Sequence, residues 1–313
     1  MVLTAGRVAL FIAHVVACAR GIPGITTPHF NRATLASLLG FGGWMTVSNI
    51  VSPLMNTLDR FIIGAVMTVD LVTYYATPHE LVTKMWLFTA ALLPVFFPAF
   101  ATSAAAAPGR TAVLFDRVLR VTFAALLLPT LALVLLAREI LVVWLGPAFG
   151  GASTTVMQVL AVAIFVNTLG QGALTLIQGL GRPDVTGKYH LLELPLYGFL
   201  LWWLLPRYGI VGAAVAWAAR AIVDSVLLLR TCPTLLPESR PALRRIWIWM
   251  AVALPALAAC TQIPWLSARV ALFLTAVPAW LAFAWFRILT PAERQAPLQA
   301  IGLTLSRSNG AGA

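Results

Sequence analysis

Charged side chains occur inside the long apolar segments of this sequence, where they are most costly to accommodate. Asp59 and Arg60 are adjacent in one such segment, and Glu80 and Lys84 lie four residues apart in the next. Ionisable groups at membrane depth cost roughly 2.5–3.5 kcal/mol each, so they persist mainly where they face a partner or a wet cavity. These residues therefore indicate either ion pairs that lock helices together or a polar pathway.

Two further groups of polar residues follow the same spacing. Arg220 and Asp224 are four residues apart, and Glu193 has His190 three residues before it and Tyr197 four residues after it. Side chains at these spacings share one face of a helix, where an ion pair contributes roughly 0.2–0.5 kcal/mol. That gain does not offset the insertion cost, so stability alone explains these residues poorly.

The motifs of common enzymes and metal sites are missing from the sequence. The stretch GRPDVTGK at 181–188 has five residues between its glycines instead of four, and Tyr189 follows the lysine, so it is not a phosphate-binding loop. The histidines are scattered, and the three cysteines form no CxxC pair. The sequence predicts no metal, no cofactor and no enzymatic activity.

The composition places the chain in a membrane. Of its 313 residues, 60% are hydrophobic and 10% are charged, and the mean hydropathy is +0.91, whereas soluble domains carry about 25% charged residues. The net charge of +11 is not clustered as nucleic-acid binding requires. The apolar runs lack the alternation of barrel strands, so we expect an all-α, polytopic bundle of membrane helices.

Segments of about 20 apolar residues, the length that crosses a bilayer, recur along the chain. We expect about nine spans, with 138–146 extending the fourth and helix breaks near Gly40, Gly42, Gly43, Pro53, Pro94 and Pro98. The spans are 2–18, 35–58 (or to 67), 71–100, 118–137, 154–179, 186–205, 209–229, 246–262 and 268–286.

Basic residues follow the positive-inside rule. Alternate loops, beginning after the first span, and the C-terminal tail hold Arg20, Arg32, Arg110, Arg117, Arg120, Arg182, Lys188, Arg230, Arg240, Arg244, Arg245, Arg287, Arg294 and Arg307. The opposite ends hold only Arg7, Arg138, Arg207 and Arg269. This bias predicts a cytoplasmic C-terminus.

Four stretches of the sequence resemble the polysaccharide (O-antigen-type) flippases of the multidrug/oligosaccharidyl-lipid/polysaccharide superfamily, which are MATE-like transporters. The stretches are FGGWMTVSNIVSPLMNTLDRFIIG (41–64), YYATPHELVTKMWLFTAALLPVFFPAF (74–100), ILVVWLGPAF (140–149) and LIQGLGRPDVTGKYHLLELPLYGFLLWWLLPRYGIVGAAVAW (176–217). The resemblance implies a transporter that moves an isoprenoid-pyrophosphate-linked oligosaccharide across the inner membrane, coupled to an ion gradient.

The resemblance also implies an arrangement in lobes. Residues 1–34 would be the last helix of an N-terminal lobe with a cytoplasmic linker, and 35–230 would be a six-helix C-terminal lobe. Residues 231–313 would add a two-helix hairpin and a cytoplasmic tail. Most of an N-terminal lobe is absent on this pattern, so we expect that the chain does not transport alone. A homodimer or a separately encoded lobe would complete the transporter. The other expected partners are the lipid-linked oligosaccharide and membrane lipid.

Roles for the buried polar residues follow from the resemblance. The bases expected to line a cavity and hold phosphate are Arg60, Lys84 and Arg220. The carboxylates expected to couple transport to protons or sodium are Glu80, Glu193 and Asp224, with Asp59 a weaker candidate beside Arg60. Aromatic side chains that could stack on sugars, or anchor the helices at the interface, are Tyr75, Trp217 and Tyr197.

Two other interpretations remain open. The first is a MATE-like multidrug or cation exporter, which would keep the fold but need an acidic cavity. The second is an inactive or partner-dependent half-transporter. A membrane enzyme such as a glycan polymerase would need a large loop with catalytic carboxylates, and every loop here is short.

Overall fold

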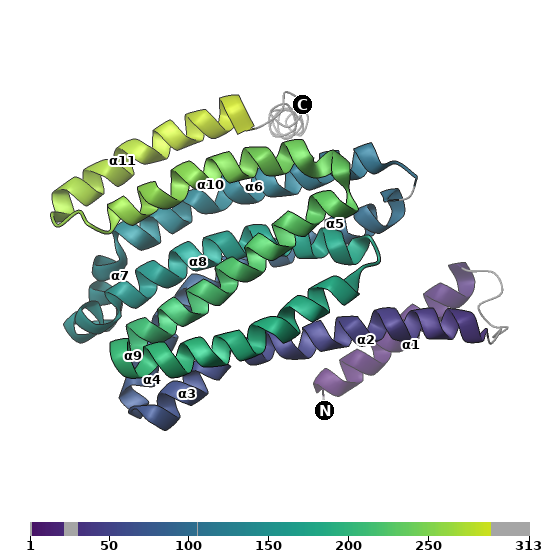
Figure 1. The fold of residues 1–313 in the computed structure, drawn as a ribbon, viewed down its shortest axis with the longest axis horizontal. Coiled ribbons are helices and arrows are strands. Elements are labelled where there is room, and N and C mark those ends of the chain that lie inside the picture. Colours follow the sequence, from purple (N-terminus) through teal and green to yellow (C-terminus); the bar gives the residue numbers. More distant parts are fainter. Residues whose placement is uncertain (1, 22–30, 105, 289–313) are drawn as a thin grey trace, which may run out of the picture. The chain divides into compact units, whose positions relative to one another are not determined.

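The computed structural model describes residues 2–21, 31–104 and 106–288, and those residues form helices and short connections without a strand (Figure 1). The all-α prediction is thus confirmed. The chain divides into two compact units, Met1–Gly43 and Trp44–Ala313. The first unit holds α1 (Val2–Gly21) and the beginning of α2 (Arg32–Met55). Most of the predicted linker and the predicted cytoplasmic tail lie outside the described residues.

The second unit is a bundle of helices that several prolines help to start. Pro108, Pro147 and Pro183 each stand at the first helical position, where the fixed φ angle suits a helix and the missing N–H group has no intrahelical acceptor. The helices after α2 are α3 (Leu58–Val66), α4 (Val69–Thr83), α5 (Trp86–Ser103), α6 (Pro108–Leu135), α7 (Ala137–Leu145), α8 (Pro147–Gly179), α9 (Pro183–Leu235), α10 (Arg240–Cys260) and α11 (Leu266–Phe283).

The long helix α9 is a hairpin of two membrane passages. Its 53 residues would span about 80 Å if straight, far more than the roughly 30 Å of a hydrocarbon core. Gly209 interrupts it with φ 57° and ψ −144°, a conformation that is almost confined to glycine. A Cβ atom on Gly212 would lie 2.3 Å from the carbonyl oxygen of Leu204, so the turn is too tight for a side chain there.

The predicted spans correspond to described helices. Seven stretches among the described residues are long and apolar enough to cross a membrane, and the turn in α9 makes one of them a double passage. The predicted span 2–18 is helical as α1, but α1 is not among those seven.

Two predicted spans contain a break. The path from α2 to α3 is interrupted at Asn56 and Thr57, just after Pro53, and the path from α4 to α5 at Lys84 and Met85. At both places the backbone makes i→i−3 hydrogen bonds, the tighter winding that often marks a hinge. The first break was predicted from Pro53, but the second has no glycine or proline at it. The other predicted break positions stay inside α2 or α5: Gly40, Gly42, Gly43, Pro94 and Pro98.

The expectation that 138–146 extends the fourth span is wrong. Leu136 leaves the helical conformation with φ −108° and ψ 17°, and α7 is a separate helix that packs against α8. Their contact is close, because a Cβ atom on Gly150 would lie 2.3 Å from Cγ2 of Val142. Small residues at helix interfaces permit such an approach.

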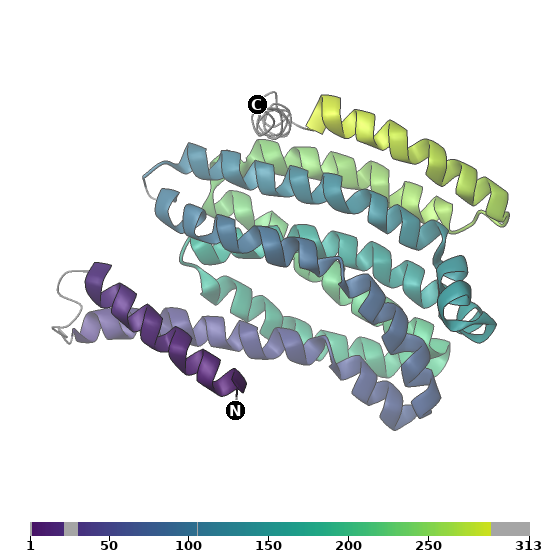
Figure 2. The ribbon, with the colours of Figure 1, turned by 180° about the vertical axis from the view of Figure 1, so that it is seen from behind.

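Helix α8 forms the centre of the second unit. It contacts α4, α5, α6, α7 and α9, and most of its side chains are buried. Figure 2, which shows the bundle from behind, lets the reader follow α5 and α6 across α8. Gly170 and Gly179 let neighbours approach, since a Cβ atom there would meet Ser225 and Phe100 at 2.5 and 2.9 Å. This helix therefore positions the polar groups described next.

Charged residues separate to the two ends of α6. At one end Asp116 binds Arg120 at 2.7 Å and Arg245 at 3.4 Å, and Arg120 donates a hydrogen bond to the carbonyl of Ile288. At the other end Arg269 binds Glu139 at 2.8 Å. The starts of α6 and α10 thus share one end of the bundle with the end of α11, as alternating passages require.

Candidate functional site

A polar cavity of about 240 Å³ lies among α2, α5, α8 and α9. Each helix contributes side chains that hydrogen-bond, although the surrounding helix faces are apolar. The polar residues and the tryptophan that line it are Ser52, Asn56, Trp86, Asn167, Gln171, Thr175, His190, Arg220 and Asp224. Apolar residues from α5, α8 and α9 complete its wall.

Arg220 lies deep in the bundle. It follows the Gly209 turn by about three helical turns, roughly 16 Å at 1.5 Å per residue, which is about half of a 30 Å hydrocarbon core. Only 3% of Arg220 is exposed. A cation at this depth persists only with partners or a wet cavity, and Arg220 has polar partners and lines a polar cavity.

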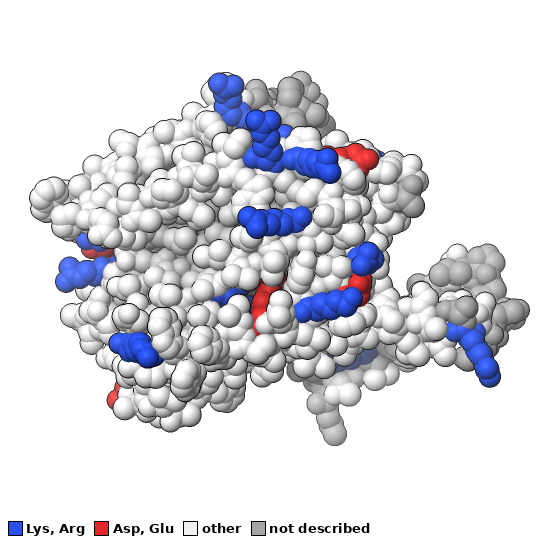
Figure 3. All heavy atoms as spheres, in the orientation of Figure 1, with Lys and Arg blue, Asp and Glu red and all other residues white. Residues whose placement is uncertain are grey.

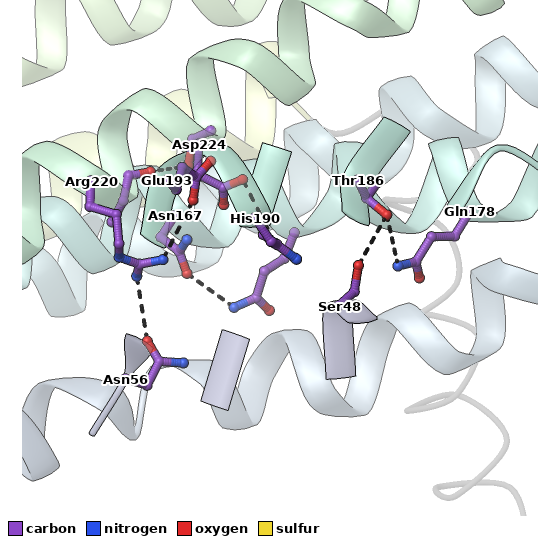
Figure 4. Close-up of polar contacts among 12 residues, drawn as sticks. Ser48, Asn56, Asn167, Gln178, Thr186, His190, Glu193, Arg220 and Asp224 are labelled. Atoms are coloured by element: carbon purple, nitrogen blue, oxygen red, sulfur yellow. Dashed lines mark hydrogen bonds and ion pairs between the residues drawn. The ribbon is translucent and has the colours of Figure 1, made fainter. Parts of the chain in front are cut away.

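The polar partners of Arg220 come from other segments, not from its own helical turn. Its Nη1 lies 3.8 Å from Oε2 of Glu193, and its Nη2 donates a 3.4 Å hydrogen bond to Oδ1 of Asn56 (Figure 4). Its guanidinium lies over the rings of Tyr197 and Trp217, 5.6 and 5.2 Å from their centroids. These are long contacts, so the guanidinium is held loosely.

The four ionisable groups of the cavity form one cluster. Nε2 of His190 lies 4.0 Å from Oδ1 of Asp224, and the carboxyl groups of Asp224 and Glu193 are close enough to interact. Within the described part of the chain, neither Glu193 oxygen nor Nε of Arg220 has a hydrogen-bond partner. Buried polar atoms are usually satisfied, so these atoms have hydrogen-bonding capacity that the protein itself does not use.

A second cluster surrounds the break between α2 and α3. Asp59 accepts hydrogen bonds from the Tyr75 hydroxyl and, at 2.8 Å, from the backbone N–H of Arg60. The Arg60 side chain reaches instead to Glu80, at 3.2 Å, and to Nδ1 of His79, at 3.1 Å. Glu80 therefore contacts Arg60 across two helices, whereas the i,i+4 spacing had indicated Lys84.

Aromatic and amide groups connect the two clusters. The rings of His79 and Trp86 lie 5.5 and 6.3 Å from that of Trp217. Nε1 of Trp86 donates a 3.2 Å hydrogen bond to Asn167, which also accepts from Gln171 at 3.2 Å. The network crosses α4, α5, α8 and α9 and links the two clusters through direct contacts.

The remaining predicted site residues have different environments. Lys84 is exposed at the break between α4 and α5 and does not line the cavity. Tyr75, Tyr197 and Trp217 are fully buried, so their rings offer no face to a sugar in this conformation. Their stacking on a substrate stays a prediction.

Sequence reasoning missed the neutral members of the site, Asn56, Asn167 and Gln171. The last two are four residues apart in α8, the same spacing that drew attention to the charged pairs. Amides at membrane depth also need partners, so that spacing was a usable signal. Among the described residues no group of three His, Cys, Asp or Glu side chains could hold a metal ion.

Comparison with known proteins agrees with the sequence motifs. Residues 3–154 match the family model described as "Polysaccharide biosynthesis protein". The chain is 35% identical over 205 residues to a Shigella flexneri protein named "Putative O-antigen transporter", across 65% of this chain and 48% of that protein. The chain thus spans about half the length of this relative. No solved structure matches the chain. The predicted resemblance is confirmed: this multi-pass membrane protein is similar to the proteins of polysaccharide biosynthesis and O-antigen transport.

Proposed function

We propose that the chain works in a flippase of the secondary-transporter type that moves an isoprenoid-pyrophosphate-linked oligosaccharide across the inner membrane. The observation that carries this proposal is the buried, loosely held guanidinium of Arg220 in a polar cavity near mid-membrane depth. A guanidinium binds phosphate oxygens through a fork of donors. Long contacts to Glu193 and Asn56 leave those donors available.

Arg60 and Lys84 extend the proposed phosphate path away from the cavity. Arg60 is partly buried and Lys84 exposed, so both lie closer to the surface of the second unit than Arg220 does. The pyrophosphate would pass from these outer bases to Arg220. We propose transport without chemical conversion of the substrate.

Glu193 and Asp224 are the proposed coupling groups. Two carboxyl groups share one guanidinium and one imidazole, so with both carboxylates ionised and the histidine neutral the cluster carries one excess negative charge. A proton or a sodium ion would balance it. Glu80 is exposed and paired with Arg60, and Asp59 is satisfied by Tyr75, so we place these two in supporting roles.

We propose that the C-terminus and the basic end of the bundle face the cytoplasm, with 35–230 as one lobe of the transporter. The bias of basic residues supports this orientation. A second lobe, either a second copy or a separately encoded chain, is the proposed partner.

The test is export of surface glycan in a strain that lacks its own O-antigen flippase and expresses the complete transporter, that is, this chain together with its second lobe. We expect R220Q to reduce export at least tenfold and R220K to retain part of it, because lysine keeps the charge but loses the fork. Membrane insertion is monitored in parallel. The proposal fails if R220Q inserts normally and exports glycan as well as the parent.

A further inference from the structure

An open groove of about 690 Å³ lies between the end of α9 and the first half of α10. On α10 its lining residues recur at intervals of three or four, so they form a single stripe of that helix. The groove belongs to the basic end of the bundle, far along α9 from the Gly209 turn. It shares no lining residue with the polar cavity.

Three arginines line this groove, namely Arg230, Arg240 and Arg244. In the part of the chain that the structure describes, no carboxylate forms an ion pair with any of them, whereas the neighbouring Arg245 turns to Asp116 at 3.4 Å. All three are exposed. Figure 3 shows Lys and Arg side chains gathering over the adjoining ends of α9 and α10.

The rest of the groove is apolar. Trp247, Ile248 and Ala251 continue the α10 stripe away from the arginines toward the middle of the membrane. Tryptophan favours the boundary between headgroups and hydrocarbon. The groove therefore offers positive charge at headgroup level, an aromatic ring at the boundary and an apolar channel below it.

We propose that this groove binds an anionic phospholipid, with its phosphodiester among the three arginines and an acyl chain along Trp247, Ile248 and Ala251. Basic pockets between membrane helices on the cytoplasmic side suit anionic headgroups. A zwitterionic lipid brings its own cation, which three unpaired arginines would repel. Charge complementarity thus selects the anionic lipid.

The test measures lipid retained by the purified chain in native mass spectrometry after titration with phosphatidylglycerol or phosphatidylcholine. We expect one phosphatidylglycerol to bind at least tenfold more tightly than phosphatidylcholine. The combined variant R230Q/R240Q/R244Q should lose that preference. R207Q is the matched control, since Arg207 is also exposed but lies beside the Gly209 turn, at the opposite end of the bundle from the groove, and it should keep the preference within twofold.

A second variant tests the apolar part without changing charge. A251F fills the groove at an exposed position and should weaken phosphatidylglycerol binding at least threefold while the melting temperature stays unchanged. Equal binding of the two lipids, an equal loss in R207Q, or full binding in A251F would each overturn the proposal. So would displacement of the lipid by an isoprenoid pyrophosphate at equimolar concentration, which would assign the groove to the transport path.

Discussion

At the scale of single residues, the cavity is organised by one cation, Arg220, that lies beside two carboxyl groups. Arg220 lies near Glu193 and Asn56, while His190 faces Asp224. Removing one member of a buried charged group leaves the others uncompensated, which typically costs about 3–5 kcal/mol. The cluster is therefore sensitive to the loss of any single charge, and its parts should not behave additively.

We expect R220M to lower the stability of the protein by about 3 kcal/mol, because it leaves Glu193 and Asp224 as neighbouring carboxylates without a cation. The double variant E193Q/R220M should recover at least half of that loss, since it removes one of the carboxylates as well. Thermal unfolding in detergent measures both. Equal destabilisation by the single and double variants would show that the pair is not coupled.

The proposed coupling role of Asp224 predicts a different phenotype. D224N keeps the shape of the side chain but removes its charge, so the variant should bind substrate and lose most of the acceleration that an imposed pH or sodium gradient gives. The measurement is flipping of a lipid-linked oligosaccharide in proteoliposomes with and without the gradient. E80Q, on the exposed side of Arg60, should keep its dependence on the gradient.

At the scale of elements, the Gly209 turn creates the site, because it brings Glu193 back to Arg220 across the two halves of α9. Sequence patterns predicted the two passages and the buried charges, since hydropathy and charge are local properties. They did not predict the partners: i,i+4 spacing paired Arg220 with Asp224, and only the fold of α9 shows the contact with Glu193. The neutral Asn56, Asn167 and Gln171 were missed because amides carry no charge, and charge inside the apolar segments was the signal that pointed to the site.

Substitutions at three glycines of α9 test the turn. G209A should destabilise the protein by about 1–3 kcal/mol through its backbone conformation alone. G212A should destabilise it at least as much, because the added Cβ atom meets a backbone oxygen at 2.3 Å. G198A is the control, because a Cβ atom there meets nothing within 4 Å. In a helix interior, alanine in place of glycine raises the stability by roughly 0.5–1 kcal/mol. If thermal unfolding shows that G198A destabilises the protein as much as G209A and G212A do, the tight hairpin is refuted.

At the scale of the whole molecule, the second unit exposes charge that a lipid-facing surface would not tolerate. The side chain of Glu80 is 62% exposed, and Lys84 is exposed in the middle of the path formed by α4 and α5. Charged groups at this depth need a water-filled cavity or a protein partner. Alternating access in two-lobed carriers supplies both, since one bundle moves against another around a shared site.

The whole-molecule prediction is that Lys84 faces water in the working transporter, in a cavity closed by a second bundle. With Cys18 replaced by alanine, since Cys232 and Cys260 are buried, K84C should react with a water-soluble maleimide in native membranes, and lipid-linked oligosaccharide should slow the reaction. V95C is the matched control, because Val95 is an apolar residue of α5 with 71% exposure and should face lipid, where the reagent does not reach. If K84C is as unreactive as V95C, the exposed charges of α4 and α5 do not border a cavity, and a second bundle would have to cover them as a dry interface.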